Sequence, residues 1–424
     1  MNEYNLVPNI RFRKFEKNWE TEKLEKLGNT FPSLSGKSKK DFGHGNAKYI
    51  TYMNVFTNPI ALMSGTEAIE IDKKQNSVKY GDVLFTMSSE TPKEVGMSSV
   101  WEYHLENVYL NSFSFGFRPN SKFDLNFLAF LLRSQGIRSQ IVILAQGISR
   151  FNISKFKMMR INITFPINHF EQKKIGDFFT KLYKLLDLQQ QKVDKLESLK
   201  KVLLKKLFPK HDTKIPELRF KGYEEDWVDR KFVNCLAKII DFRGKTPKKL
   251  GLSWSRNGNY RALSALNVKN GFIDKNIDVH FGNYDLYKKW MGKTELKKGD
   301  ILFTTEAPMG NVAIIKDNEK YILSQRTIAF RVNEKNINSL FLLYRLNTVS
   351  VKNKLMSLST GGTAQGISQK NLSYLFISIS NSLDEQKRIG NVLAKVDHLI
   401  YLENKKLENL QQFKKCLLQN MFVE

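Results

Sequence analysis

The sequence predicts an α+β protein built as a tandem repeat, in which two similar globular domains are each followed by one long helix. Three matches between the halves support this fold class. The stretch 171–210, which begins EQKKIG, recurs at 385–424 as EQKRIG, an offset of 214 residues (385 − 171). The strings VPNIRFRKFEKNW (7–19) and YGDVLFT (80–86) recur as IPELRFKGYEEDW (215–227) and KGDILFT (298–304). Because each copy is about half the chain, the repeated units are domains and not solenoid repeats.

Both copies of the first match predict a long amphipathic helix. Asn168 and Ser382 stand three residues before Glu171 and Glu385, which is the spacing of an N-terminal capping box. A helix of about 37 residues is about 55 Å long, and an apolar stripe of that length requires cover. We therefore expect the two helices to pair, parallel or antiparallel, as a coiled coil with pseudo-two-fold symmetry. A coiled coil that only dimerises the protein is the alternative.

The apolar residues of the two helices recur every three or four positions, which places them on one stripe. The residues expected to pair the helices or to contact a partner are Ile175, Phe178, Leu182, Leu196, Leu203, Ile389, Val392, Val396, Leu410 and Leu417, and Leu185, Leu199, Leu399 and Phe413 continue the same stripe.

Within each half, short β-like runs such as DVLFTM, NSFSFGF and ISIS alternate with helical stretches such as LNFLAFLLRSQ and SLFLLYRLNTVS. The expected boundaries are a first globular domain at 1–165, a central long helix at 166–210, a second globular domain at 211–380 and a C-terminal long helix at 381–424. Residues 211–215 form the expected linker between the halves.

The composition points to a partner with many negative charges. The 424 residues carry a formal charge of +26, with a pI near 9.7 and 41% hydrophobic residues. Nucleic acid is favoured over a membrane, because the longest apolar runs, such as FLAFLL at 127–132, are too short to span a bilayer. The N-terminus has no signal-peptide pattern, and the two cysteines, Cys235 and Cys416, are expected to be buried thiols of a reduced, cytoplasmic protein.

Motifs of catalysis are absent from the sequence. Three Gly-Lys-Ser/Thr strings lack the upstream glycine that a P-loop requires, and Asn58-Pro59-Ile60 lacks the rest of an amino-methyltransferase loop. The six histidines are scattered, so no metal site is expected. Glu171 and Glu385, each two residues before a lysine, could belong to a nuclease half-motif, but their place in a first helical turn favours a capping role.

The repeat layout, the two EQK[KR]IG helix starts, the two Gly-Asp-aliphatic-Leu-Phe-Thr strings, RGKTP at 243–247 and the two AQGIS strings resemble the specificity subunit of type I restriction-modification systems over nearly the whole chain. The resemblance implies a non-catalytic subunit whose two target-recognition domains read the two parts of a split, asymmetric DNA site, while the paired helices fix the gap. It also implies two modification subunits with S-adenosylmethionine and two motor-nuclease subunits with ATP and Mg.

For phosphate contacts we expect basic residues of Gly-containing segments, at positions where a solvated basic face is the alternative: Lys37, Lys39, Lys40, Arg243, Lys245, Lys248 and Lys249. For base edges we expect polar residues of the AQGIS loops and of positions that differ between the halves: Ser88, Ser89, Ser112, Gln146, Ser149, Arg150, Thr305, Gln325, Arg326, Thr363, Gln365 and Ser368.

The differing positions are paired by aligning the two AQGIS strings, which sets Arg150 against Lys370. In the same way Ser88 and Ser89 are set against Thr305 and Glu306, and Ser112 and Phe113 against Gln325 and Arg326. The alternative is that AQGIS is a repeated structural turn. At the level of the whole protein, a stand-alone DNA-binding regulator or clamp, or a nuclease or methyltransferase with an unrecognised site, stays open.

Overall fold

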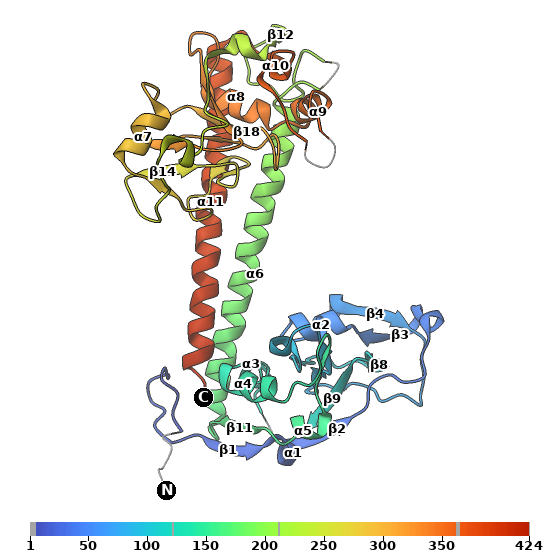
Figure 1. The fold of residues 1–424 in the computed structure, drawn as a ribbon. Coiled ribbons are helices and arrows are strands. Elements are labelled where there is room, and N and C mark those ends of the chain that lie inside the picture. The colour runs from blue at the N-terminus through green and yellow to red at the C-terminus, as the bar shows by residue number, and fades with distance from the viewer. Residues whose placement is uncertain (1–5, 121–122, 211–212, 362–364, 424) are drawn as a thin grey trace. The chain divides into compact units, whose positions relative to one another are not determined.

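The computed structural model describes residues 6–120, 123–210, 213–361 and 365–423. The chain forms two compact units, the first made of Met1–Gln190 with Lys406–Glu424 and the second of Gln191–Lys405. Each unit holds one globular domain of mixed helices and strands and one half of each of two long helices (Figure 1). The predicted α+β tandem repeat is confirmed.

The globular part of the first unit contains two main sheets, of strand order β2-β9-β5-β7 and β4-β3-β8, and the small pairs β1-β11 and β10-β6. Its strands are β1 Glu20–Lys23, β2 Gly28–Phe31, β3 Phe42–Ile50, β4 Thr66–Ile69, β5 Val83–Thr86, β6 Ser88–Ser89, β7 Ser98–Val100, β8 Val108–Leu110, β9 Ser114–Pro119, β10 Phe151–Asn152 and β11 Asn162–Phe165. Its helices are α1 Leu24–Leu27, α2 Tyr52–Thr57, α3 Leu125–Leu131, α4 Gln135–Ile143 and α5 Lys155–Met158, with 3-10 turns at Lys39–Asp41, Met63–Gly65 and Pro92–Glu94.

The second unit repeats this plan with sheets of order β13-β21-β18-β19 and β17-β14-β20 and the pairs β12-β22 and β15-β16. Its strands are β12 Val228–Lys231, β13 Leu236–Asp241, β14 Tyr260–Leu263, β15 Val268–Lys269, β16 Phe272–Ile273, β17 Phe281–Gly282, β18 Ile301–Thr304, β19 Val312–Ile314, β20 Tyr321–Leu323, β21 Thr327–Val332 and β22 Phe376–Ile379. Its helices are α7 Tyr284–Met291, α8 Ser339–Leu346, α9 Val349–Ser357 and α10 Gln369–Leu372, with 3-10 turns at Phe232–Cys235 and Lys248–Leu250.

The repeated Gly-Asp string opens a central strand in each unit. Asp82 is buried before β5 and accepts two hydrogen bonds of 2.7 Å from Arg118 on the neighbouring β9. In the second unit, Asp300 before β18 pairs in the same way with Arg331 of β21, at 2.7 Å. A buried carboxylate needs such a partner, so the motif is accounted for by the sheet itself.

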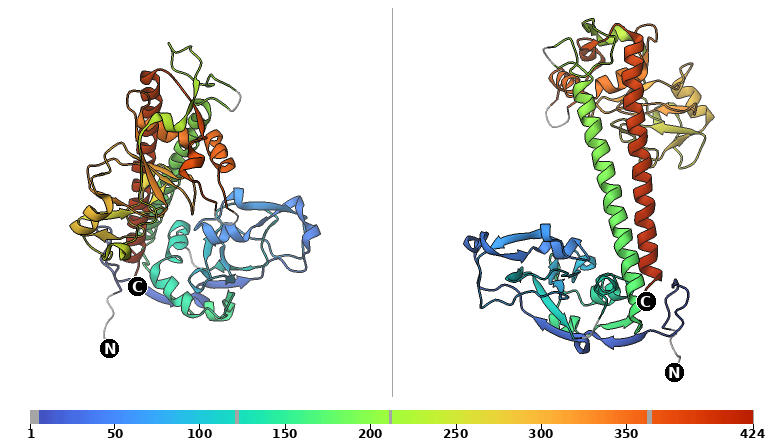
Figure 2. Two further views of the ribbon diagram at one scale, coloured as in Figure 1. Left: turned by 45° about the horizontal axis from the view of Figure 1, so that its top comes forward. Right: turned by 180° about the vertical axis from the view of Figure 1, so that it is seen from behind.

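The two long helices, α6 His169–Lys206 and α11 Leu383–Asn420, pair antiparallel within each unit (Figure 2). In the first unit, Phe179 stacks on Phe422 with ring centroids 5.4 Å apart. In the second unit, Lys192 contacts Glu403 at 2.5 Å and Lys200 contacts Asp397 at 2.6 Å. Residue numbers rise along α6 while those of their partners fall along α11, which settles the orientation that the sequence left open.

The inner faces of both helices follow a heptad pattern, with steps of three and four residues alternating from Ile175 and from Ile389. The inner residues are Ile175, Phe179, Leu182, Leu186, Gln189, Val193, Leu196, Lys200, Leu203 and Leu207, and, 214 positions later, Ile389, Leu393, Val396, Ile400, Glu403, Leu407, Leu410, Lys414, Leu417 and Met421. Of the predicted pairing residues, Phe178 and Val392 are only partly buried, since Phe179 and Leu393 take the inner positions. Leu185, Leu199, Leu399 and Phe413 lie outside the inner face and are exposed.

The EQK[KR]IG motif fastens each globular domain to the helix that follows it. Glu171 is 1% exposed and accepts hydrogen bonds from Arg11 at 2.7 and 2.9 Å, and Glu385 pairs with Arg219 at 2.7 and 3.1 Å. Gln172 accepts the backbone N–H of Asp124, the residue that caps α3. The predicted N-caps are present, because Asn168 and Ser382 accept backbone N–H groups, but the two glutamates bind arginines and not the cap.

Glycine is required in this motif by close packing. A Cβ on Gly176 would lie 2.5 Å from the backbone nitrogen of Phe127 at the start of α3, and a Cβ on Gly390 would lie 2.8 Å from Leu340 Cβ at the start of α8. Each helix therefore passes against the N-terminal turn of a domain helix at a distance that only glycine permits.

Each unit is closed by an aromatic residue from the end of a long helix. Phe422 packs against Trp19, Phe127 and Phe179 in the first unit. Phe208 packs against Trp227 and Phe341 in the second unit. The expectation that both cysteines are buried is half wrong: Cys235 is buried, whereas Cys416 is exposed, because it stands one position before the inner residue Leu417.

Candidate nucleic-acid interface

In the first unit, three loops that are distant in sequence meet at one surface. β6 pairs with β10, so that Ser88 lies opposite Asn152. Gln146 and Asn152 exchange both backbone hydrogen bonds, at 2.9 and 2.8 Å, and close residues 147–151 into a loop. The N–H of Met87 donates to the carbonyl of Phe113 at 2.9 Å, which adds the loop between β8 and β9 to the surface.

The side chains of this surface combine a guanidinium with exposed apolar groups. Arg150 donates to the hydroxyl of Ser88 at 3.2 Å, and its guanidinium lies 5.6 Å from the ring centre of Phe113. Phe113 is 55% exposed and Ile148 is 98% exposed. Arginine pairs with guanine edges, and apolar side chains contact the thymine methyl group, so this combination is suited to a DNA groove.

The second unit assembles the equivalent three loops with other side chains. The N–H of Thr305 donates to the carbonyl of Arg326 at 2.9 Å, Glu306 bridges to Gly366, and Thr360 and Gly366 exchange both backbone hydrogen bonds at 2.9 Å. The side chain of Arg326 lies 3.4 Å from Glu306. An arginine and a glutamate can recognise guanine and cytosine edges respectively.

The third loop shows that the two AQGIS strings are not structurally equivalent. Ser154 caps α5 as Ser368 caps α10, an offset of 214 residues, whereas the two strings align at an offset of 219. Ile148 of the first string is exposed, whereas Ile367 of the second is 3% exposed and corresponds to the equally buried Ile153. The alternative that AQGIS is one repeated turn is therefore wrong.

The same correspondence changes two of the expected pairs. Ser88 corresponds to Glu306 and not to Thr305, because each pairs with the closing residue of its third loop, and Arg150 has no counterpart in Lys370, which lies within α10. Ser112 and Phe113 do correspond to Gln325 and Arg326, since the carbonyls of Phe113 and Arg326 accept equivalent bonds.

The structure brings most of the expected base-reading residues to these two surfaces. Exposed members are Ser112, Gln146, Ser149, Arg150, Gln325, Arg326, Gln365 and Ser368. Ser88, Ser89 and Thr305 lie beneath the loops and are at most 8% exposed. Thr363 lies outside the described residues. Ser368 already accepts the N–H of Asn371 as a helix cap.

Two contributors to the surfaces escaped the sequence reasoning. Asn152 closes the third loop of the first unit, and Tyr52 of α2 donates its hydroxyl to the carbonyl of Ser88 at 2.7 Å. Burial raises the pKa of the Tyr52 hydroxyl. An alignment at an offset of 214 throughout the third loop would have identified Asn152.

The expected phosphate residues of the first unit lie at the far end of β3 from the three loops. Lys39 and Lys40 are exposed in the 3-10 turn that precedes β3. Lys37 contacts Asp72 at 2.7 Å, and this contact raises the pKa of the lysine and lowers that of the aspartate to about 2. Part of the charge of Lys37 is thus offset within the protein.

In the second unit the expected phosphate segment contacts the helix that follows the third loop. Asp241 binds Arg243 at 2.6 Å and also accepts a hydrogen bond of 2.7 Å from Gln369 in α10. Lys245 donates to the carbonyl of Trp290 at 2.5 Å, and Lys249 to that of Gly244 at 2.9 Å. Lys248 is exposed, so this segment offers free cationic surface beside α10.

The long helices carry a second apolar stripe, one position before the inner residues. Its members are Leu185, Leu188 and Phe413 in the first unit and Leu199, Val202, Leu399 and Leu402 in the second, all between 43% and 52% exposed. Leu185 and Leu188 recur as Leu399 and Leu402, 214 positions later, so the two units present equivalent stripes. We name these seven residues the outer stripe.

Within the described residues, no group of three or more His, Cys, Asp or Glu side chains is arranged to hold a metal ion. Over the same residues, no helix is long and apolar enough to cross a membrane.

Comparisons with known proteins agree on one family. The model of the type I restriction modification DNA specificity domain matches twice, at residues 16–198 and 224–412. A putative type I restriction enzyme specificity subunit, MjaX, from Methanocaldococcus jannaschii is 27% identical over 363 residues, which cover 82% of this chain and 80% of the relative.

Two solved structures share the fold. The S subunit of a type I restriction-modification system from M. genitalium has a TM-score of 0.63 at 15% identity and covers 99% of both chains. A chain from a structure of type I restriction-modification complex assembly and conformational transition has a TM-score of 0.54 at 17% identity, covering 96% of this chain and 98% of the other.

Proposed function

Because this chain belongs to the type I restriction-modification DNA specificity family, as a specificity subunit with two such domains, we propose that the three-loop surface of each unit reads one half of a split DNA site. The specificity subunit is the non-catalytic member of its complex, and methylation and cleavage are the work of other subunits.

The observation that carries this proposal is one framework with two sets of side chains. Both units build the surface from equivalent backbone hydrogen bonds. At the variable positions the first unit offers Ser88, Phe113 and Arg150, and the second offers Glu306 and Arg326. Equivalent surfaces with unlike side chains are suited to an asymmetric site whose halves differ in sequence.

Within this proposal, the recognition domains extend over 1–165 and 211–380, and the helices at 166–210 and 381–424 hold them at a fixed spacing. The exposed Lys39, Lys40, Lys248 and Lys249 contact phosphates, and each such contact adds about 0.9 to the slope of log affinity against log salt concentration. Arg150 and Arg326 read bases, so their replacement relaxes recognition at one base pair at a cost of about 1–3 kcal/mol.

We further propose that two modification subunits dock on the outer stripe, one in each unit. The stripe is apolar and exposed, and it occurs twice in equivalent positions. An apolar stripe beside a heptad seam is suited to further helices that pack onto the pair. The modification subunits would supply S-adenosylmethionine, two motor-nuclease subunits would supply ATP and Mg chemistry, and the complex would act in the cytoplasm.

Co-expression with a candidate modification subunit, followed by single-molecule sequencing of methylated adenines, tests the function. One split motif that requires this chain is the expected result. Exchange of residues 1–165 for the equivalent domain of a relative should change one half of that motif only. A change in both halves would contradict independent reading, and tight sequence-specific binding without any partner would favour a stand-alone regulator.

Leu188→Lys and Leu402→Lys test docking separately from reading. Each should weaken association with the modification subunit, and because the helix surface does not contact bases in this proposal, the half-site sequences should stay unchanged. Unaltered association of the double variant would place the docking site elsewhere.

A further inference from the structure

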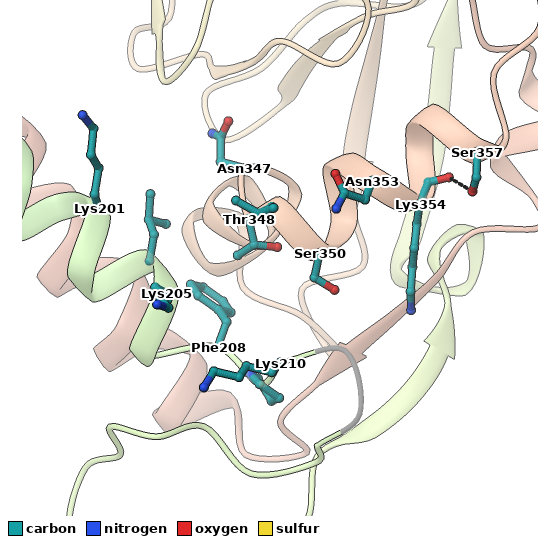
Figure 3. Close-up of a pocket in the computed structure, with 13 residues that line it drawn as sticks. Lys201, Lys205, Phe208, Lys210, Asn347, Thr348, Ser350, Asn353, Lys354 and Ser357 are labelled. Atoms are coloured by element: carbon teal, nitrogen blue, oxygen red, sulfur yellow. Dashed lines mark hydrogen bonds between the residues drawn. The ribbon is translucent and has the colours of Figure 1, made fainter.

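The second unit contains a pocket of about 750 Å³ that none of the functions above uses. One wall is the last turn of α6 with the segment after it, and the other is the start of α9 with the turn before it (Figure 3). Leu204, Phe208 and Pro209 form an apolar floor, and Val349 at the mouth is 73% exposed.

The rim of this pocket is cationic. Lys201 and Lys205 come from α6, Lys210 from the segment after it, and Lys354 from α9. Lys210 pairs with Glu217 outside the pocket. No aspartate or glutamate is among the described residues that line it, and its other polar groups are the hydroxyls and amides of Ser350, Asn353 and similar residues.

Positive charge also lies directly beneath the floor. Arg345 is 2% exposed, its guanidinium lies 5.7 Å from the ring centre of Phe208, and burial lowers its pKa to about 10. Its Nε finds no hydrogen-bond partner among the residues that the structure describes. Thr348 donates its hydroxyl to the carbonyl of Arg345, and no side chain caps the N-terminus of α9. The buried guanidinium and the helix N-terminus both favour a negative charge in the pocket.

The charge belongs to one repeat only. At an offset of 214 residues, Lys205 corresponds to Gln419, Lys210 to Glu424 and Lys354 to Gln140, and only Lys201 keeps its charge as Lys415. Both halves of a DNA site offer phosphates to both repeats. A ligand that is held by one repeat alone is therefore better explained as a partner that binds once per chain.

We propose that this pocket binds an acidic segment of a partner protein, with an aliphatic side chain of the segment on the floor and its carboxylates against the lysine rim. The apolar floor favours such a segment over a DNA backbone, which has no apolar group to bury there. A nucleotide base is disfavoured because Phe208 is 2% exposed and its ring already packs against Trp227, Phe341 and the guanidinium of Arg345.

The test measures the fluorescence anisotropy of a labelled acidic peptide with a central pair of leucines, titrated with the full chain. A peptide with serines in place of the leucines reports the contribution of the floor, and a random-sequence DNA duplex serves as competitor. The leucine peptide should bind saturably with one site per chain, and the serine peptide roughly tenfold more weakly, since burial of one leucine contributes about 1.5–3 kcal/mol at most.

Two pairs of variants locate the site. Lys201→Glu should weaken peptide binding roughly tenfold, whereas Lys415→Glu, the same change at the equivalent position of the other repeat, should leave it unchanged. Val349→Glu adds a carboxylate at the mouth and at the first position of α9, where an acidic residue stabilises the helix. It should weaken binding without loss of folding, and Gln135→Glu at the first position of α4 is its control.

Three results would overturn the proposal: no binding of the leucine peptide, equal binding of the serine peptide, or equal effects of Lys201→Glu and Lys415→Glu. If Lys201→Glu lowers the affinity for the duplex but not for the peptide, the pocket is a phosphate site and the partner-protein assignment is wrong.

Discussion

Replacement of Glu171 by alanine should open the first unit and leave the second folded. The carboxylate is 1% exposed and accepts three hydrogen bonds, from Arg11 Nε at 2.7 Å, Arg11 Nη2 at 2.9 Å and Trp19 Nε1 at 3.3 Å. The Arg11 side chain is itself only 11% exposed. Alanine at position 171 would therefore leave a guanidinium and an indole N–H desolvated and without their acceptor.

The expected loss is large relative to the stability of a domain. Removal of one partner from a buried ion pair costs about 3–5 kcal/mol, because the remaining charge is uncompensated. A domain has about 5–15 kcal/mol of stability in total. Glu171→Gln keeps one acceptor oxygen and the side-chain volume, so we expect a smaller loss of about 1–3 kcal/mol. The double change Arg11→Met with Glu171→Leu should recover most of the loss, since apolar residues often replace a buried pair without cost.

Hydrogen exchange read by mass spectrometry resolves the two units. In Glu171→Ala the amides of α3 should lose protection by two to three orders of magnitude, about the effect of 3–4 kcal/mol, while those of α8 keep theirs. Glu385→Ala should give the reverse pattern, because Glu385 holds Arg219 in the second unit. Equal loss in both units, or a loss below about 1 kcal/mol, would refute the view that this pair fastens domain to helix.

Three further predictions concern the helices. Gly176→Ala and Gly390→Ala should each destabilise their unit in urea unfolding by about 1–3 kcal/mol, despite a gain of about 1 kcal/mol in helix propensity, and the first should be the worse because its contact is shorter; a stabilised variant would contradict the close packing. Lys414 and Lys200 occupy equivalent inner positions, but burial and then Arg133 lower the pKa of Lys414, whereas Lys200 pairs with Asp397. Lys414→Met should therefore stabilise the protein by up to about 1 kcal/mol and remove the rise in stability expected between the lowered pKa of Lys414 and its unfolded value of 10.5. Lys200→Met should destabilise it by about 1–3 kcal/mol, and thermal melts at several pH values separate the two. Finally, insertion of one heptad in both helices should lengthen the gap of the methylated motif by about three base pairs, since seven residues add about 10.5 Å and DNA rises about 3.4 Å per base pair; an unchanged gap would exclude the spacer role.

The repeat and the long helices were predictable because their signal is dense and local. The inner face was harder to place, because apolar residues come in neighbouring pairs, Phe178 with Phe179 and Leu185 with Leu186. A period of 3.6 accepts either member of a pair, whereas the paired helices follow a period of 3.5, which selects Phe179 and Leu186. The rejected members, Leu185 among them, form the outer stripe.

The candidate interface was predictable in its loops but not in its register. Five identical letters, AQGIS, outweighed the weaker match of FNIS at 151–154 with QGIS at 365–368, although only the latter shares the buried isoleucine and the capping serine. The roles of Glu171 and Asp82 also escaped the sequence reasoning, because their partners, Arg11 and Arg118, are brought to them by tertiary structure.

The aromatic closure of each unit by a helix end affects the order in which the protein can be made. Every residue of the second unit, Gln191–Lys405, leaves the ribosome before Lys406–Glu424, the stretch that completes the first. The domain translated first must therefore wait with its Trp19 pocket open until Phe422 arrives, while the domain translated second can close at once around Phe208. Shortening the chain by its last three residues would accordingly injure the part of the protein that was synthesised earliest.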